Sequence, residues 1–188
     1  MPARRWRRTA VLAACLVLLA GLIAPSESRA ATAAEIDAAA NATIATFEAK
    51  YTGAKKMLEA SPGVAIFPNV VKAAFVFGGQ YGEGVLREQG RSIAYFSWAG
   101  GSWGASIGVQ KKDIIMVFRD PAALKHFESS SGWRAGVDGS ITLLTVGAGT
   151  DLSTMQINQP IVAFVVGEKG LMGDVSFTGS KITRIHPK

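Results

Sequence analysis

The chain has 188 residues, of which 48% are hydrophobic and 18% are charged, with 21 glycines and a single cysteine. This composition is too apolar for a disordered protein and suits one globular domain preceded by an export segment. The first thirty residues carry five basic side chains and one acidic side chain, so most of the net charge of +6 lies there and is no argument for nucleic-acid binding.

The first thirty residues have the three parts of a signal peptide. A cationic start (Arg4, Arg5, Arg7, Arg8) precedes an apolar run over residues 10–24, and Ser28 and Ala30 stand at the −3 and −1 positions of a cleavage site. The run is shorter than the roughly 20 residues of a membrane-spanning helix, so an uncleaved anchor is the less favoured alternative. We predict cleavage after Ala30 and a periplasmic or secreted protein of residues 31–188.

Cys15 leaves a second possibility open. Leu12-Ala13-Ala14-Cys15 resembles a bacterial lipobox, in which the cysteine would be acylated and become the mature N-terminus. The apolar run continues past Cys15 to Ala24, where a lipoprotein tether should be polar, so the lipoprotein remains the minor alternative. A chain that begins at Ala31 has no cysteine, which excludes disulfides, thiolate metal sites and cysteine nucleophiles.

Helix signals mark the start of the mature chain. Thr32 and Glu35 form a capping-box pattern, and apolar residues then recur at helical spacing, which predicts an amphipathic helix over about 33–51. A short second helix is expected over 54–60, ended by Ser61-Pro62-Gly63.

From Gly63 onward, short apolar runs alternate with glycines, a pattern typical of strands and turns. Asp120 and Pro121 predict the start of one inserted helix. Strands are expected at 64–67, 73–77, 84–86, 93–98, 113–118, 132–138, 140–146, 161–166, 171–177 and 181–185. The predicted fold is therefore α+β in a single domain over residues 31–188. It is a strongly curved antiparallel sheet, barrel- or sandwich-like, of about ten short glycine-rich strands, with N-terminal amphipathic helices and one short inserted helix.

Catalytic chemistry has little support in the sequence. Neither histidine, His126 or His186, has an evident partner, and no two carboxylates have the spacing of a calcium loop or an acid–base pair. No phosphate-binding loop or serine-nucleophile elbow occurs. We therefore assign no catalytic residue, metal or cofactor.

A membrane surface would instead be recognised by apolar and basic side chains together. An indole has an apolar body and one polar donor, and a lysine or arginine beside it attracts anionic head groups. The candidate lipid-binding residues are Lys55, Lys56, Lys72, Lys111, Lys112, Arg119 and Trp103.

The glycine-rich part of the chain also resembles a known family. The stretch from Gly63 to Gly84, GVAIFPNVVKAAFVFGGQYGEG, resembles the start of the SYLF-domain family. Similar segments follow at 101–108, 120–127, 132–133, 167–173 and 179–182. The resemblance implies a lipid-binding module made of N-terminal amphipathic helices on a glycine-rich β body. Eukaryotic members bind phosphoinositide membranes and, in yeast, actin.

The sequence is consistent with three functions. The first is an exported, non-enzymatic lipid-binding or membrane-associated protein whose partner is phospholipid. The second is a structural or adhesive envelope protein that binds another protein through a sheet edge or an aromatic patch. The third is a hydrolase of lipid-like substrates, which would require a role for His126 or Asp138. Neither the lipid nor an oligomeric state is assigned.

Overall fold

The structure is a computed structural model that describes residues 30–144, 149–155, 157–169 and 179–188. Side chains are described within these ranges except at residues 74–77, 102–107 and 167–169. The predicted signal peptide, with Cys15, lies outside the described residues, and so does the strand expected at 171–177. Residues Ala31–Lys188 form one compact unit.

The first helix, α2 (Ala33–Lys50), has the predicted capping box. The Thr32 hydroxyl accepts a hydrogen bond from the backbone N–H of Glu35 at 3.2 Å, and the Glu35 carboxylate accepts one from the backbone N–H of Thr32 at 2.7 Å. These bonds satisfy two of the N–H groups that a helix start leaves without partners. One face of the helix is buried, formed by Ile36, Ala40, Thr43 and Phe47.

Polar contacts fix α2 to the sheet. The Asp37 carboxylate accepts hydrogen bonds from Ser92 at 2.6 Å, Tyr95 at 2.8 Å and Arg87 at 3.2 Å, and Arg87 also donates to Asn41 at 2.7 Å. Burial opposes ionisation of Asp37, but these hydrogen bonds outweigh it and hold the pKa of its carboxyl below the ordinary value.

Three shorter helical segments follow. The predicted second helix is α3 (Ala54–Glu59), which begins after Gly53 in the left-handed conformation. The inserted helix is α4 (Pro121–Ser129), where the Asp120 carboxylate accepts a hydrogen bond from the Ala122 backbone N–H at 3.0 Å. A short 3₁₀ helix, η1 (Leu152–Thr154), was not predicted, because three residues carry no periodic pattern.

Two long strands replace the short strands expected between residues 64 and 118. β1 (Gly63–Glu88) and β2 (Arg91–Phe118) form one antiparallel hairpin around Gln89 and Gly90, both with positive φ. The pairing continues through Gly78, which lies opposite Ser102, and through the glycines that follow. Glycine lowers strand propensity without removing the backbone donor, so it did not end these strands as the sequence pattern had suggested.

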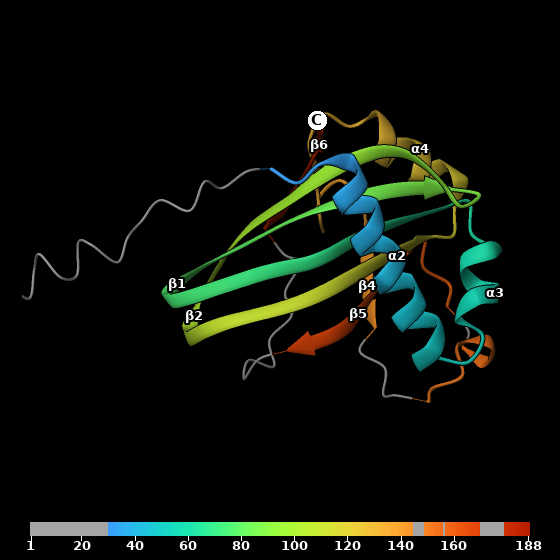
Figure 1. Ribbon diagram of the computed structural model, residues 1–188, viewed down its shortest axis with the longest axis horizontal. Coiled ribbons are helices and arrows are strands. Elements are labelled where there is room, and N and C mark those ends of the chain that lie inside the picture. Colours follow the sequence, from blue (N-terminus) through green and yellow to red (C-terminus); the bar gives the residue numbers. More distant parts are fainter. Residues whose placement is uncertain (1–29, 145–148, 156, 170–178) are drawn as a thin grey trace, which may run out of the picture. The chain divides into compact units, whose positions relative to one another are not determined.

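The long hairpin bends back on itself (Figure 1). In a straight strand the twelve steps from Val70 to Gly82 would span about 40 Å. Instead, a Cβ atom placed on Gly82 would lie 2.7 Å from a Val70 methyl group, and one on Gly84 would lie 2.5 Å from the Phe67 ring. The two halves of β1 therefore touch, and only glycine allows so close an approach.

A bulge in β1 changes which side chains face inward. Phe67 lies opposite Ile114 and Val70 lies opposite Lys112, so β1 uses three residues where β2 uses two. At the bulge Asn69 has a φ of 55°, and its backbone N–H donates to the Asp113 carboxylate at 2.8 Å. Because successive side chains point to opposite faces, the extra residue exchanges the two faces for the rest of the strand.

β2 is the central strand of the sheet. Its first part pairs with β6 (Ser180–Ile185) and its last part with β5 (Ile161–Lys169). Two short strands complete the described sheet: β3 (Trp133–Arg134) beside β6, and β4 (Ile141–Leu144) beside β5. The predicted α+β fold with a strongly curved sheet is confirmed. The pairing is not purely antiparallel, since β4 and β5 are parallel across a connection long enough for a crossover.

Apolar side chains fill both sides of the first half of the hairpin. Phe67 and Met116 belong to an inner cluster, which also holds Trp98 and Phe127 of α4. Their neighbours Ile66 and Val117, together with other residues of β1, β2 and β5, form an outer cluster beneath α2 and α3. This alternation places the two N-terminal helices on the outer face of the sheet.

Candidate functional site

The connection between α2 and α3 is fixed to the segment around η1. The backbone N–H of Leu152 donates to the Thr52 carbonyl at 2.9 Å, and that of Gly149 donates to the Lys50 carbonyl at 3.0 Å. A Cβ atom on Gly53 would lie 2.9 Å from the backbone nitrogen of Ser153. The start of α3 and η1 therefore pack against each other, and together they form one side of the space between these helices and the sheet.

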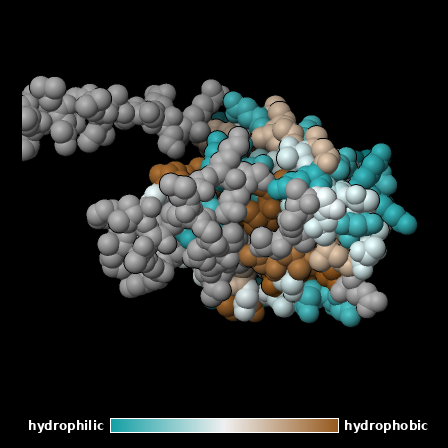
Figure 2. Space-filling model, turned by 90° about the horizontal axis from the view of Figure 1, so that it is seen from below, coloured by the Kyte–Doolittle hydropathy of each residue, from teal (hydrophilic) through white to brown (hydrophobic). Residues whose placement is uncertain are grey.

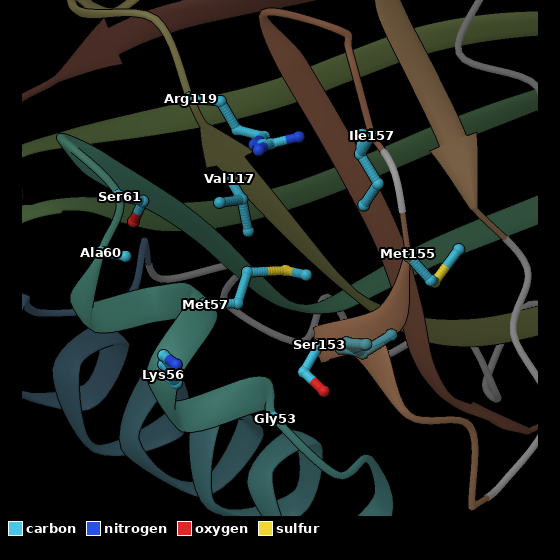
Figure 3. A pocket seen from close by; sticks show the side chains of 11 residues that line it. Gly53, Lys56, Met57, Ala60, Ser61, Val117, Arg119, Ser153, Met155 and Ile157 are labelled. Carbon is cyan, nitrogen blue, oxygen red and sulfur yellow. The ribbon is translucent and has the colours of Figure 1, made fainter.

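A pocket of about 370 Å³ lies between α3, η1 and the end of β2 (Figure 3). One wall of the pocket is apolar and consists of methyl and thioether groups, from the side chains of Met57, Val117, Met155 and Ile157. Arg119 extends over the pocket from the end of β2. We call this the basic pocket, because its described lining includes Lys56 and Arg119 and no acidic residue.

Both cations of the basic pocket are exposed, and neither forms an ion pair within the described residues. Arg119 is held at its backbone, where its N–H donates to the Pro160 carbonyl at 2.8 Å. Beside the pocket, hydrogen bonds from the Ser153 side chain and backbone hold the pKa of the Asp151 carboxyl below its ordinary value. An anionic group with an attached apolar chain matches this arrangement, since it can contact both cations and the apolar wall.

The surface around these elements is mixed. Seen from below, hydrophobic and hydrophilic side chains adjoin on the side of the protein where α2 ends and η1 lies (Figure 2). A surface of this kind can approach a membrane interface, where apolar and charged groups are contacted together.

Of the predicted lipid-binding residues, Lys56 and Arg119 line the basic pocket. Lys55 is also on α3 but does not line the pocket, and its ammonium lies 4.0 Å from Glu59. Lys111 is exposed elsewhere on β2, directly opposite the exposed Val71. Trp103 lies opposite Phe77 in the hairpin, and its side chain is outside the described part of the structure.

Lys72 and Lys112 point into the protein. Their exposed fractions are 3% and 1%, and they lie on the inner face of the hairpin near the buried Gln110. Neither is therefore on an exposed basic surface, contrary to what their sequence neighbours suggested. The bulge at Asn69 explains the position of Lys72, because without it the alternation that buries Phe67 would turn residue 72 outward.

Sequence reasoning missed the apolar half of the basic pocket. Met155 and Ile157 belong to an irregular segment with no period of strand or helix, so no pattern indicated what they face. Their only signal was the presence of large apolar residues in a connection that is otherwise polar. Met57 belongs to the short helix that was predicted, but its direction was not.

His126 and Asp138 line a separate polar hollow of about 520 Å³ at the end of α4. The hydroxyls of Ser129 and Ser130 donate to the backbone carbonyl of His126, at 3.2 and 2.8 Å. Hydrogen bonds from the Arg134 side chain and backbone hold the pKa of the Asp138 carboxyl below its ordinary value. These groups thus cap the helix and close a turn. Among the described residues, no three histidines, cysteines or carboxylates gather as a metal site.

Comparison with known proteins gives one family. The family model described as Ysc84, a Las17-binding protein and actin regulator, matches residues 99–186. The matched segment contains Arg119, the greater part of β2 and strands β3 to β6, and it leaves out α2, α3, β1 and the start of β2. No curated protein matches the chain. Within the described residues, no helix is both long and apolar enough to cross a membrane.

Proposed function

We propose, from the match of residues 99–186 to the Ysc84, or SYLF, family, that the chain is an exported, non-enzymatic lipid-binding protein that associates with membranes through the basic pocket. The family is one of lipid-binding and actin-regulatory domains, which accords with a membrane-associated role.

One observation carries the proposal: two exposed cations stand over an apolar wall in the basic pocket. Near an anionic membrane each lysine or arginine contributes on the order of 1 kcal/mol. Apolar contact adds about 25 cal/mol for each Å² removed from water. Burial of about 80 Å² of apolar surface would equal the contribution of two cations. We therefore expect binding that weakens with added salt without vanishing.

The export proposal is supported by the surroundings of Ala31. The Ala31 nitrogen lies 3.0 Å from the Glu83 carboxylate, which also accepts a hydrogen bond from the Tyr81 hydroxyl at 2.8 Å. Cleavage after Ala30 would turn this nitrogen into an ammonium group with an anionic partner already beside it. The mass of the purified envelope form tests this proposal, because a diacylated Cys15 would give a different N-terminus.

Sedimentation with vesicles tests membrane association. The purified protein is mixed with neutral, anionic and phosphoinositide-containing vesicles at low and high salt. We expect the double substitution Lys56→Glu with Arg119→Glu to abolish binding to anionic vesicles. The matched control is Lys125→Glu with Arg91→Glu, which makes the same charge change at two exposed positions outside the pocket. Equal losses in both variants would contradict the proposed site.

The second candidate is a structural or adhesive envelope protein that binds another protein. The observation in its favour is an exposed apolar pair on the outer face of the hairpin, with Val71 39% and Val109 68% exposed near Lys111. If this surface is the functional one, Val109→Glu will abolish capture of a protein partner and leave vesicle binding unchanged.

A further inference from the structure

A second hollow lies on the opposite side of α3. It has a volume of about 460 Å³ and is formed by α2, α3, the first residues of β1 and the tip of the hairpin. Its apolar floor consists of Ile44, Leu58, Val64 and Ile66. We call it the acidic pocket, because its rim carries Glu48 and Glu59. Both pockets fall in the size range of about 300 to 1,000 Å³ that is usual for ligand sites.

The two pockets share one floor. Val64 lines the acidic pocket and Val117 lines the basic pocket, and these valines are direct cross-strand partners on the outer face of the sheet. Such partners have Cβ atoms about 5 Å apart. Helix α3 lies above them, with Met57 on one side and Leu58 on the other. What separates the pockets is therefore α3 and not the sheet.

Helix α3 is weakly held. It has six residues, and a helix of that length has little stability of its own. Ala54 is its only fully buried residue, and its N-terminus at Gly53 has no side-chain cap. Segments with few buried contacts open at low cost in free energy. Gly53 at one end, and Pro62-Gly63 at the other, bound the segment that would move.

The two pockets differ in charge. Lys56 and Arg119 attract an anion to the basic pocket, whereas Glu48 repels one from the acidic pocket. Glu59 repels an anion less strongly, because its carboxylate lies 4.0 Å from the Lys55 ammonium. Arg87 also lines the acidic pocket, but its guanidinium is held by Asp37, at 3.2 Å. A ligand with one anionic end would therefore be oriented in a single direction.

We infer that α3 is a movable cover over a channel for one acyl chain. The anionic end of the ligand lies between Lys56 and Arg119, the chain passes over Val117 and Val64 beneath α3, and its end lies in the acidic pocket against Ile44. The ligand is a fatty acid or one chain of an anionic membrane lipid. This inference rests on the proposed lipid binding and adds the path of the chain and its direction.

The length of the chain provides the first test. The full-length protein is titrated with octanoate and hexadecanoate, and binding is measured by displacement of a fluorescent fatty acid. Burying one methylene group improves affinity about fourfold, so hexadecanoate should bind at least about a hundredfold tighter than octanoate. Equal affinities would show that the chain stops in the basic pocket and would overturn the channel.

Filling the far end of the channel provides the second test. Ile44→Trp adds volume in the acidic pocket without touching the basic pocket, and it should weaken hexadecanoate at least about tenfold and leave octanoate unchanged. The control is Ile44→Met, which keeps the side chain close to its original volume and should bind like the natural protein. If Ile44→Trp folds and still binds hexadecanoate normally, the channel is wrong. If it does not fold, the chain-length series in the natural protein decides.

The direction of the acyl chain in the channel is tested with hexadecanedioate, which has a carboxylate at both ends. It should bind at least about tenfold more weakly than hexadecanoate, because its second carboxylate meets Glu48 and Glu59. The double substitution Glu48→Gln with Glu59→Gln should restore most of that loss. Equal affinity for the two acids in the natural protein would contradict the proposed direction.

The source of the chain follows from a third ligand. Tighter binding of hexadecanoate than of lysophosphatidylglycerol indicates a free fatty acid, and the reverse order indicates a membrane lipid. If vesicle binding needs Lys56 and Arg119 but octanoate and hexadecanoate bind equally well, the channel is overturned and the proposed function stands. Failure to bind any vesicle or fatty acid would overturn the proposed function as well.

Discussion

Two helices cover the outer face of the sheet, and they are held in very different ways. Helix α2 has a buried stripe, a capping box and a carboxylate, Asp37, with three donors. Helix α3 buries only Ala54 completely and has a hollow on each side. The comparison separates two tasks: α2 stabilises the fold, whereas α3 forms part of the candidate site and is loose enough to move.

The largest effect is expected from a substitution in α2, the more firmly held of the two helices. Phe47 is fully buried and contacts the rings of Tyr51 and Phe164, at 5.2 and 5.1 Å between centroids. Phe47→Ala should lower the free energy of unfolding by about 3 to 5 kcal/mol, measured by urea denaturation. Met57 of α3 is half-buried, so Met57→Ala should lower the free energy of unfolding by less than about 2 kcal/mol. The same substitution should weaken lipid binding. Equal losses of stability in the two variants would contradict the conclusion that α2 is held more firmly than α3.

The next effect concerns the start of α3. Gly53 has a φ of 77° and lies against Ser153, so Gly53→Ala combines backbone strain with a steric clash and should cost about 2 to 4 kcal/mol. Gly136 is the control, because it has a φ of 80° and no atom within 4 Å of an added Cβ. Gly136→Ala should cost only the strain, about 1 to 2 kcal/mol. Thermal denaturation compares the two, and equal costs would mean that the contact with η1 is unimportant.

The polar anchor of α2 should make stability depend on pH. Because the pKa of Asp37 is lowered in the folded protein, its contribution is present above the unfolded value of 3.8 and is lost as the pH falls through the folded value. Its side chain is 31% exposed, so Asp37→Asn should cost only about 1 to 2 kcal/mol near neutral pH. Urea denaturation of both proteins from pH 7 to pH 2 should show the difference shrinking in acid. A constant difference would exclude an electrostatic contribution.

The smallest effect is expected on the exposed face of α3. Lys55 and Glu59 lie one helical turn apart, at 4.0 Å, and both side chains are largely exposed. Lys55→Ala should change the free energy of unfolding by less than about 0.5 kcal/mol and leave vesicle binding nearly unchanged. A strong loss of vesicle binding would move the proposed site from the pocket to the exposed face of the helix.

Local patterns in the sequence were sufficient for the helices. Thr32 with Glu35, and Asp120 with Pro121, mark helix starts through bonds between residues two or three positions apart. The short apolar run after Gly63 likewise indicated a buried strand at 64–67. The strong curvature of the sheet was predicted from the number of glycines, and Gly82 and Gly84 lie where the bent hairpin requires them.

Only the tertiary structure decided which basic residues can meet a ligand. Lys56 and Arg119 are far apart in the chain and line one pocket because α3 and the end of β2 form two of its sides, whereas Lys72 is turned inward by one extra residue near Asn69. The sequence by itself determined the helix boundaries, the α+β class and the family resemblance, because these depend on short-range bonds and repeated patterns. The site depends on strand register and on how distant segments pack, and a shift of one residue reverses which face a side chain occupies.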